Sequence, residues 1–276
     1  MDKLTKIIEK KEKPMYREDL IGLFRKLEIK SGDIVIMHVS LSSLGYLVGG
    51  EQSLIQTLLE YLGADGTLVM PSQTVNISNP NMWEYPPVPE NWQDAVRDSI
   101  YPYEVDKTPV DDMLGVVARY FSTYKNTKRS NHPLYSFCAN GKMADTIISR
   151  HDYDYGFGME SPLGKMYELD AKVLMIGTDF DSNTSIHLAE NFLDRDTIIE
   201  SAPVLVDGEK KWIEFKNVDL DIYDDFPEIE KEFKKEYSNS IHIEEIFNGE
   251  AMYFSMRDCV DFSKKYYFKK EKNILI

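Results

Sequence analysis

The hydrophobic positions of the chain form two alternating patterns, which predict buried strands and amphipathic helices. Short apolar runs occur at 33–39 (DIVIMHV), 66–71 (GTLVMP) and 172–177 (KVLMIG), and such runs are typical of strands buried on both faces. Between the first two runs, apolar residues recur at helical spacing before Gly63: Leu54, Ile55, Leu58, Leu59 and Leu62. A strand, a loop, a helix and a second strand within about 30 residues predict a parallel crossover.

Other segments extend this alternation. Residues 17–28 (REDLIGLFRKLE) predict an amphipathic helix, and the third apolar run leads through a polar loop into a predicted helix at 186–193 (IHLAENFL). The stretch 203–215 (PVLVDGEKKWIEF) predicts a β-hairpin that turns at Asp207–Gly208. Residues 224–238 predict a charged helix with a solvated face.

The segment 75–112 is rich in Pro, Trp, Tyr and Asn, and it contains too many aromatic residues for a disordered spacer. Long ordered loops in compact domains usually have a function, so we expect an irregular excursion on the substrate side of the molecule. The predicted fold is a single α/β domain over residues 1–276. Its central, partly parallel sheet is flanked by helices, with a helical or irregular insertion and a small antiparallel element.

The charge of the chain narrows the choice of partners. Its 47 acidic and 32 basic residues give a net charge of −15, which argues against nucleic acid and anionic membrane surfaces. That charge suits a polycationic small molecule, although it also serves solubility. The first residues (MDKLTKIIEKKEK) are charged where a signal peptide needs an apolar core, and no run reaches transmembrane length. We therefore expect a cytoplasmic protein, as a monomer or homodimer.

The loop 38–50 (HVSLSSLGYLVGG) is crowded with Ser and Gly at the end of one predicted strand and the start of a helix. Backbone N–H groups at such a position can bind phosphate without basic side chains. The loop matches neither of the common glycine-rich nucleotide-binding patterns, so an ordinary connecting turn remains an alternative.

The segment 181–190 (DSNTSIHLAE) is the best candidate for catalysis. Its first four residues are typical of a helix start, which places His187 near the first turn, where the helix dipole disfavours a protonated imidazole. Glu190 lies three residues later on the same helical face. A purely structural histidine remains an alternative. A metal site formed by Asp179, Asp181, His187 and Glu190 is a weaker one, because a single histidine with scattered carboxylates is a poor zinc signal.

A third stretch, 129–141 (RSNHPLYSFCANG), is locally basic at Arg129. Its positive charge suits an anionic cofactor. Cys138 has no partner in the sequence that would activate a thiol, so we expect a small buried residue rather than a nucleophile. The second cysteine, Cys259, is far away in the sequence, and both are expected to be reduced thiols.

Taken together, these stretches resemble the aminoglycoside 3-N-acetyltransferase family, also called the antibiotic N-acetyltransferase group. The resemblance covers most of the chain in ordered motifs, which lie at 38–74, 83–92, 107–115, 129–141, 161–177 and 181–190. It implies acetyl transfer from acetyl-coenzyme A to the 3-amino group of the 2-deoxystreptamine ring of an aminoglycoside antibiotic. No metal is expected in this reaction.

The resemblance also implies the roles of individual residues. His187 is the expected general base, held by Glu190 or Asp181. The expected cofactor-binding residues are His38, Ser40, Leu41, Ser42, Ser43, Leu44, Gly45, Gly49, Gly50, Arg129, Ser136 and Phe137. The expected substrate-binding residues are Thr74, Glu84, Asp154 and Glu190. The oxyanion of the tetrahedral intermediate needs a donor, for which Thr74 or a backbone N–H of residues 40–45 is a candidate.

Three positions depart from the common pattern of the family. Val39 stands where a small polar residue is usual, Phe180 replaces a more usual histidine, and Cys138 stands at a typical alanine position. Because Val39 and Phe180 are expected near the site, these two departures leave open which amine is the acceptor substrate. The alternatives are acetylation of another small amine, a non-catalytic coenzyme A-binding protein on the same scaffold, and a metal hydrolase.

Overall fold

The protein is described by a computed structural model that covers residues 5, 8, 13–84, 86–220 and 222–272. The expectation for the N-terminal segment 1–13 therefore falls largely outside the described residues. Seven strands form one sheet in the order β3-β4-β2-β1-β5-β9-β8, and β6 and β7 form a separate two-stranded sheet. The strands are β1 (Ile34–Val39), β2 (Thr67–Pro71), β3 (Lys128–Arg129), β4 (Phe137–Gly141), β5 (Lys172–Ile176), β6 (Thr197–Val206), β7 (Glu209–Val218), β8 (His242–Glu245) and β9 (Glu250–Ser255).

The centre of the large sheet is parallel. Strand β1 pairs in parallel with β2 on one side and with β5 on the other, while β4 and β9 add antiparallel neighbours. These three strands are the three apolar runs of the sequence, and the helix α3 (Gly50–Leu62) makes the predicted crossover between β1 and β2. The predicted α/β class with a partly parallel sheet and a small antiparallel element is confirmed. The assignment of residues 1–276 to one domain stays a prediction.

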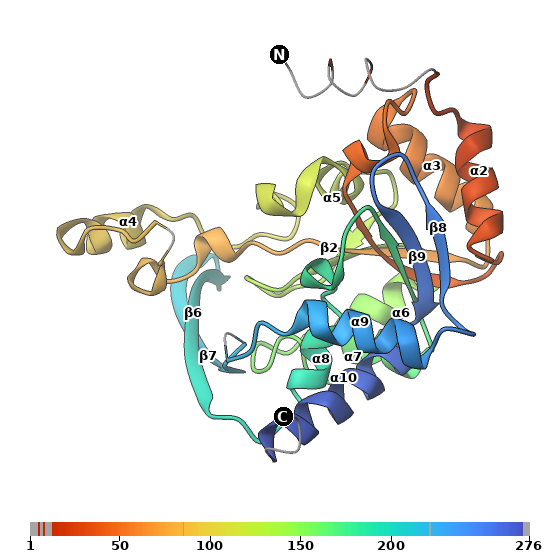
Figure 1. Cartoon of the computed structure of the whole chain (residues 1–276). Helices are drawn as coiled ribbons and strands as arrows, with labels where there is room; N and C mark the ends of the chain where they lie inside the picture. Colours follow the sequence, from red (N-terminus) through yellow and green to blue (C-terminus); the bar gives the residue numbers. More distant parts are fainter. Residues whose placement is uncertain (1–4, 6–7, 9–12, 85, 221, 273–276) are drawn as a thin grey trace.

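Both faces of the sheet are buried, because neighbouring side chains along a strand point to opposite sides. In β1, Val35 and Met37 join one hydrophobic cluster and Ile36 joins the other. The first cluster is covered by α2 (Arg17–Lys26), α3 and α5 (Gly115–Ser122). The second is covered by α6 (Ala144–Ile148), α7 (Pro162–Glu168), α8 (Ile186–Glu190), α9 (Phe226–Glu236) and α10 (Met256–Glu271). In Figure 1 these two groups of helices lie on opposite sides of the sheet.

The predicted hairpin and excursion lie together at one side of the molecule. Asp207 and Gly208 turn the hairpin with φ of 54° and 81°, as the tight turn of a two-residue loop requires. The segment 75–112 contains α4 (Gln93–Ser99) and short 3₁₀ turns, and Figure 1 shows α4 projecting away from the sheet near β6. The N–H of Asn79 donates to Ser201 O and that of Tyr103 donates to Pro203 O, so the excursion is anchored on β6.

Among the described residues, no helix combines the length and the apolar character that crossing a membrane requires.

Two histidines, His132, which is buried, and His151, which is half-buried, tie the loops beside the hairpin together. The rings of His132 and His151 lie 4.7 Å apart. Nδ1 of His132 accepts the N–H groups of Leu134 and Tyr135, so its Nε2 is the donor to Tyr153 O. Burial lowers the pKa of His132 to about 4, and burial together with His132 lowers that of His151 well below its usual value. Both rings are therefore neutral in the folded protein near pH 7.

This pair predicts a loss of stability in mild acid. A histidine whose folded pKa lies below the unfolded value of 6.5 binds its proton in the unfolded chain first, so stability falls as pH drops below 6.5 and continues to fall towards 4. The slope is about 1.4 kcal/mol per pH unit for each such group at most. In His132→Asn, Oδ1 can accept the same backbone N–H groups but cannot ionise. Denaturant unfolding between pH 7 and 5 should therefore show a flatter slope for the variant, and equal slopes would contradict the assignment.

Candidate active site

A cleft of about 510 Å³ lies at the carboxyl ends of the three parallel strands. Its lining comes from the end of β1, the residues after β2, the segment 111–118, the loop after β5 and the first turn of α8. The lining residues are Met37, His38, Val39, Ser40, Met70, Pro71, Gln73, Val75, Asp111, Met113, Leu114, Gly115, Ala118, Thr178, Asp181, Ser182, Thr184 and His187. This is the edge at which open α/β sheets usually bind ligands.

His187 lies at this cleft and is held by Glu190. Nδ1 of His187 lies 2.6 Å from Oε2 of Glu190, whose carboxylate has no exposed surface, while the imidazole is 25% exposed. An ionised carboxylate only accepts hydrogen bonds, so Nδ1 carries the proton and Nε2 keeps its lone pair. The sequence left open whether Glu190 or Asp181 orients His187. In the structure, Glu190 is the one in contact with the imidazole.

Two aromatic rings hold the imidazole in place. The ring of Phe157 stacks on that of His187 at 5.1 Å, and Phe226 meets it edge-on at 5.9 Å. The helix α8 spans only Ile186–Glu190, shorter than the predicted 186–193, so its dipole is weak. The orientation of His187 therefore depends on the carboxylate and the two rings.

Asp181 lies on the rim of the cleft with an exposed side chain. Partial burial and the neighbouring carboxylates of Asp179, Asp224, Glu230 and Glu228 raise its pKa above the usual value. Asp111 also lines the cleft, and its Oδ1 accepts the N–H of Met113. The described lining contains two carboxylates and no lysine or arginine, so the cleft attracts cations.

The glycine- and serine-rich loop turns at the edge of this cleft. After His38, Val39 and Ser40, the chain forms a 3₁₀ turn at Leu41–Leu44 and enters α3 through Gly49 and Gly50, whose φ values are 81° and 54°. Ser40 Oγ lies 3.4 Å from Ser42 Oγ, and both residues are half-buried. Ser43 and Leu44 face the interior, so only part of the predicted loop can meet a ligand with its side chains.

His38 lies on β1 beside His187 and is 6% exposed. Its burial and the nearby His187 lower its pKa to about 3, so the ring is neutral. Nε2 of His38 is buried without a hydrogen-bond partner among the described residues.

Three of the residues expected to bind the cofactor occupy other places. Arg129 donates to the carbonyls of Thr108 and Ser72 and to Ser136 Oγ, and its guanidinium packs over the ring of Tyr103. Ser136 and Phe137 are fully buried. Backbone carbonyls occupy the guanidinium and the other two side chains are fully buried, so the cofactor role of these three residues stays a prediction.

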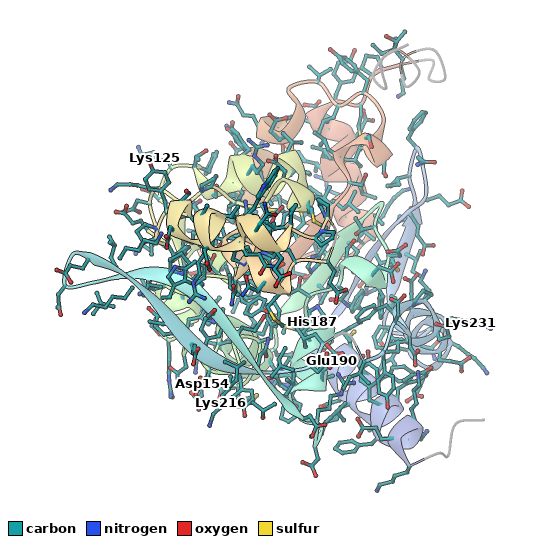
Figure 2. All side chains as sticks on the ribbon, turned by 90° about the vertical axis from the view of Figure 1, so that its left-hand side faces the viewer. Lys125, Asp154, His187, Glu190, Lys216 and Lys231 are labelled. Carbon is teal, nitrogen blue, oxygen red and sulfur yellow. The ribbon has the colours of Figure 1, made fainter. Side chains whose placement is uncertain are left out.

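None of the expected substrate-binding residues lines the cleft, and Glu190 is fully buried against His187. Thr74 is fully buried and its hydroxyl donates to Pro133 O, although its neighbours Gln73 and Val75 both line the cleft. Glu84 is exposed on the excursion. Asp154 accepts the backbone N–H of Lys216, and Figure 2 shows both residues well apart from His187 and Glu190. Each carboxylate or hydroxyl therefore has a structural partner or faces solvent instead.

The departures from the family pattern have different surroundings. Val39 lines the cleft, whereas Phe180 is buried against Phe233 and Phe254. Cys138 and Cys259 are buried free thiols, as expected, and burial raises the pKa of Cys259 to about 12.

Over the described part of the chain, no cluster of three or more His, Cys, Asp or Glu side chains is arranged to hold a metal ion.

Sequence reasoning missed Arg195, which donates to Glu190 at 3.0 Å from the irregular segment after α8. It also missed the contact between Gly177 and Ser43 that fixes the loop. Ser43 Oγ donates to Gly177 O, and the N–H of Asn248 donates to Ser43 O. A side chain at Gly177 would overlap that of Ser43.

The site and the fold together are those of an α/β enzyme with a histidine–carboxylate pair at the ligand edge of its sheet. A sequence model described as aminoglycoside 3-N-acetyltransferase matches residues 36–267. The chain belongs to the aminoglycoside 3-N-acetyltransferase family of acyltransferase enzymes. This confirms the family that the sequence motifs indicated.

Individual relatives agree with this assignment. The SPbeta prophage-derived aminoglycoside N(3')-acetyltransferase-like protein YokD of Bacillus subtilis is 37% identical over 274 residues, covering 98% of this chain and 99% of its own. Aminoglycoside N(3)-acetyltransferase IX of Micromonospora chalcea is 32% identical over 209 residues, covering 75% of this chain and 73% of its own. The crystal structure of YokD superposes with a TM-score of 0.90 at 35% identity, covering 97% of this chain and 98% of that chain.

A more distant structure is that of the aminoglycoside acetyltransferase AAC(3)-IVa, in which a histidine-to-alanine mutant is bound to a gentamicin. It has a TM-score of 0.77 at 26% identity, and the match covers 94% of this chain and 90% of that chain.

The Gly177–Ser43 contact predicts the effect of a single methyl group. Gly177→Ala should displace the 41–44 turn and weaken binding of coenzyme A, because the new Cβ overlaps Ser43. The matched control is Gly208→Ala in the hairpin turn, which also has a positive φ but open space around it. Calorimetric titration with coenzyme A should show weaker binding only for Gly177→Ala. Equal affinities of the two variants for coenzyme A would show that the 41–44 turn is not part of the cofactor site.

Proposed function

We propose that the chain transfers an acetyl group from acetyl-coenzyme A to an amino group of an aminoglycoside, with His187 as general base. One observation carries this proposal. His187 lines the cleft at the carboxyl ends of β1, β2 and β5, and Glu190 is buried against it, with Nδ1 donating to the carboxylate and Nε2 left as a proton acceptor.

The base is needed because of the chemistry of amines. An ammonium group has no lone pair, so the attacking nitrogen must be deprotonated before or during its attack on the thioester carbonyl. Nε2 of His187 takes this proton, and Glu190 stabilises the imidazolium that forms. The tetrahedral intermediate then collapses as its C–S bond breaks, and the imidazolium returns the proton to the departing thiolate. The amide and the free thiol of coenzyme A leave, so the transfer needs no covalent intermediate on the enzyme.

The loop between β1 and α3 is the proposed place of the acetyl donor. Ser40 and Ser42 offer hydroxyl groups, and Gly49 and Gly50 let the backbone approach a ligand closely at the start of a helix of 13 residues. The first N–H groups of such a helix have no intrahelical partner and suit phosphate oxygens. This matters because the described lining offers no lysine or arginine.

The acceptor is proposed to lie between Asp181 and the 111–118 segment. Carboxylates at Asp111 and Asp181 attract ammonium groups, and Met113, Leu114 and Ala118 supply apolar contact for sugar rings. The bound gentamicin of the AAC(3)-IVa relative supports an aminoglycoside as the class of acceptor. An assay of a panel of amines with acetyl-coenzyme A distinguishes an aminoglycoside acceptor from another small amine.

Replacement of the base tests the mechanism. His187→Ala should lower kcat on the order of 10²–10⁴-fold, because the variant loses the proton acceptor that Glu190 orients. Coenzyme A should bind nearly as before, since the loop proposed to bind it lies between β1 and α3 and does not contain His187. Thiol release measures the rate and calorimetry measures coenzyme binding. Near-normal kcat in a folded variant would remove His187 from the mechanism.

Removal of a rim carboxylate tests the acceptor site. Asp181→Asn should raise KM for a polycationic amine by roughly 2–5-fold, the effect of an exposed ion pair. Asp154→Asn is the matched control, because Asp154 bonds to Lys216 N away from the cleft and Asn can accept the same bond. At about 1 M salt, where charges are screened beyond about 3 Å, the difference between the variants should disappear. An unchanged KM at low salt would place the acceptor elsewhere.

A further inference from the structure

Arg195 is a buried cation behind the catalytic pair. It follows α8 in the chain, and its side chain is only 2% exposed. Nη1 donates to Oε1 of Glu190 at 3.0 Å and to the carbonyl of Asp219 at 3.1 Å. The guanidinium also packs against the rings of Tyr223 and Tyr267, which stack on each other, at 4.9 Å and 5.4 Å from their centres.

The two oxygens of Glu190 therefore have different partners. Oε2 accepts from the imidazole of His187, and Oε1 accepts from Arg195. The carboxylate has no exposed surface, so water cannot stabilise its charge. A buried carboxylate remains ionised only when a positive group and hydrogen bonds compensate for the lost hydration.

The protonation of Glu190 decides which nitrogen of His187 can act. An ionised Glu190 accepts the proton of Nδ1 and leaves a lone pair on Nε2. A protonated Glu190 would instead donate its O–H to Nδ1, and the neutral ring would then carry its proton on Nε2. That tautomer cannot accept a proton from the attacking amine, and loss of the correct tautomer is costly in other histidine–carboxylate sites.

We propose that Arg195 is a positioning residue that keeps Glu190 ionised and thereby fixes His187 in the tautomer whose Nε2 is a base. This inference rests on the proposed role of His187. Arg195 touches neither substrate; it acts only through Glu190.

The other charged and titratable groups near Glu190 do not replace this cation. They are His187 on α8, Tyr267 and Glu271 on α10, and the Asp225–Lys270 ion pair beside Tyr223. Glu271 lies 3.6 Å from Nε of Arg195, and burial and then Glu190 raise the pKa of the Tyr267 phenol above its usual value. Lys270 is occupied by Asp225.

The test compares kcat/KM of four variants across pH 6 to 9, each divided by the wild-type value so that ionisation of the acceptor amine cancels. Arg195→Met should lower the ratio by roughly 10-fold or more at pH 6–7, and the ratio should recover as pH rises. Glu190→Gln should show a loss that does not recover. Arg195→Lys, which keeps a cation, should restore most of the activity. Arg195→Gln is a second uncharged variant with the same expected profile as Arg195→Met.

Arg257→Met controls for the loss of a structural arginine. Arg257 donates to the carbonyls of Tyr167 and Glu168 and packs over the Tyr167 ring, but it contacts no site residue. Its removal should lower the thermal midpoint without changing the pH profile. A loss in Arg195→Met that is the same at every pH would overturn the inference, as would full activity in that variant. Normal activity in His187→Ala would instead overturn the proposed function.

Discussion

The buried carboxylate of Glu190 is the group on which the geometry of this site depends. It has no exposed surface, so its two oxygens must find their partners within the protein. One partner is the imidazole of His187 and the other is the guanidinium of Arg195. Because both bonds are made, the ring of His187 has a defined orientation and tautomer before any substrate arrives. This preorganisation lets one short helix present the proposed base to the cleft.

The sheet brings the remaining parts of the site to the same place. Parallel pairing of β1 with β2 and β5 puts the carboxyl ends of these strands at one edge, and each strand is followed there by a segment that lines the cleft. The loop after β1 is fastened to the end of β5 by the contact of Ser43 with Gly177. The proposed donor loop and the histidine helix are thus fixed relative to each other through two neighbouring strands.

Local patterns predicted the elements of the fold. The apolar runs became β1, β2 and β5, and the alternation of Val35, Ile36 and Met37 between two clusters explains why these runs are continuous. The motif at 181–190 correctly indicated that Glu190 could reach His187, because three residues in a helix bring side chains to the same face.

Contacts that depend on tertiary structure could not be predicted in this way. Helix α8 ends at Glu190, so the return of Arg195 to the carboxylate follows no helical spacing. Thr74 has the right chemistry for the cleft but faces Pro133, while the residues on either side of it line the cleft. The expected need for carboxylates around a polycationic substrate likewise made Asp154 a candidate for the substrate site, yet its carboxylate accepts a backbone N–H of β7.

The tautomer of His187 tests the account most directly. Nitrogen-15 NMR of histidine-labelled protein distinguishes a ring nitrogen that carries a proton from one that does not, and the His187 signals are those lost in His187→Ala. At a pH where the ring is neutral, the account predicts a protonated Nδ1 and an unprotonated Nε2. A protonated Nε2 in the folded wild-type protein would contradict it.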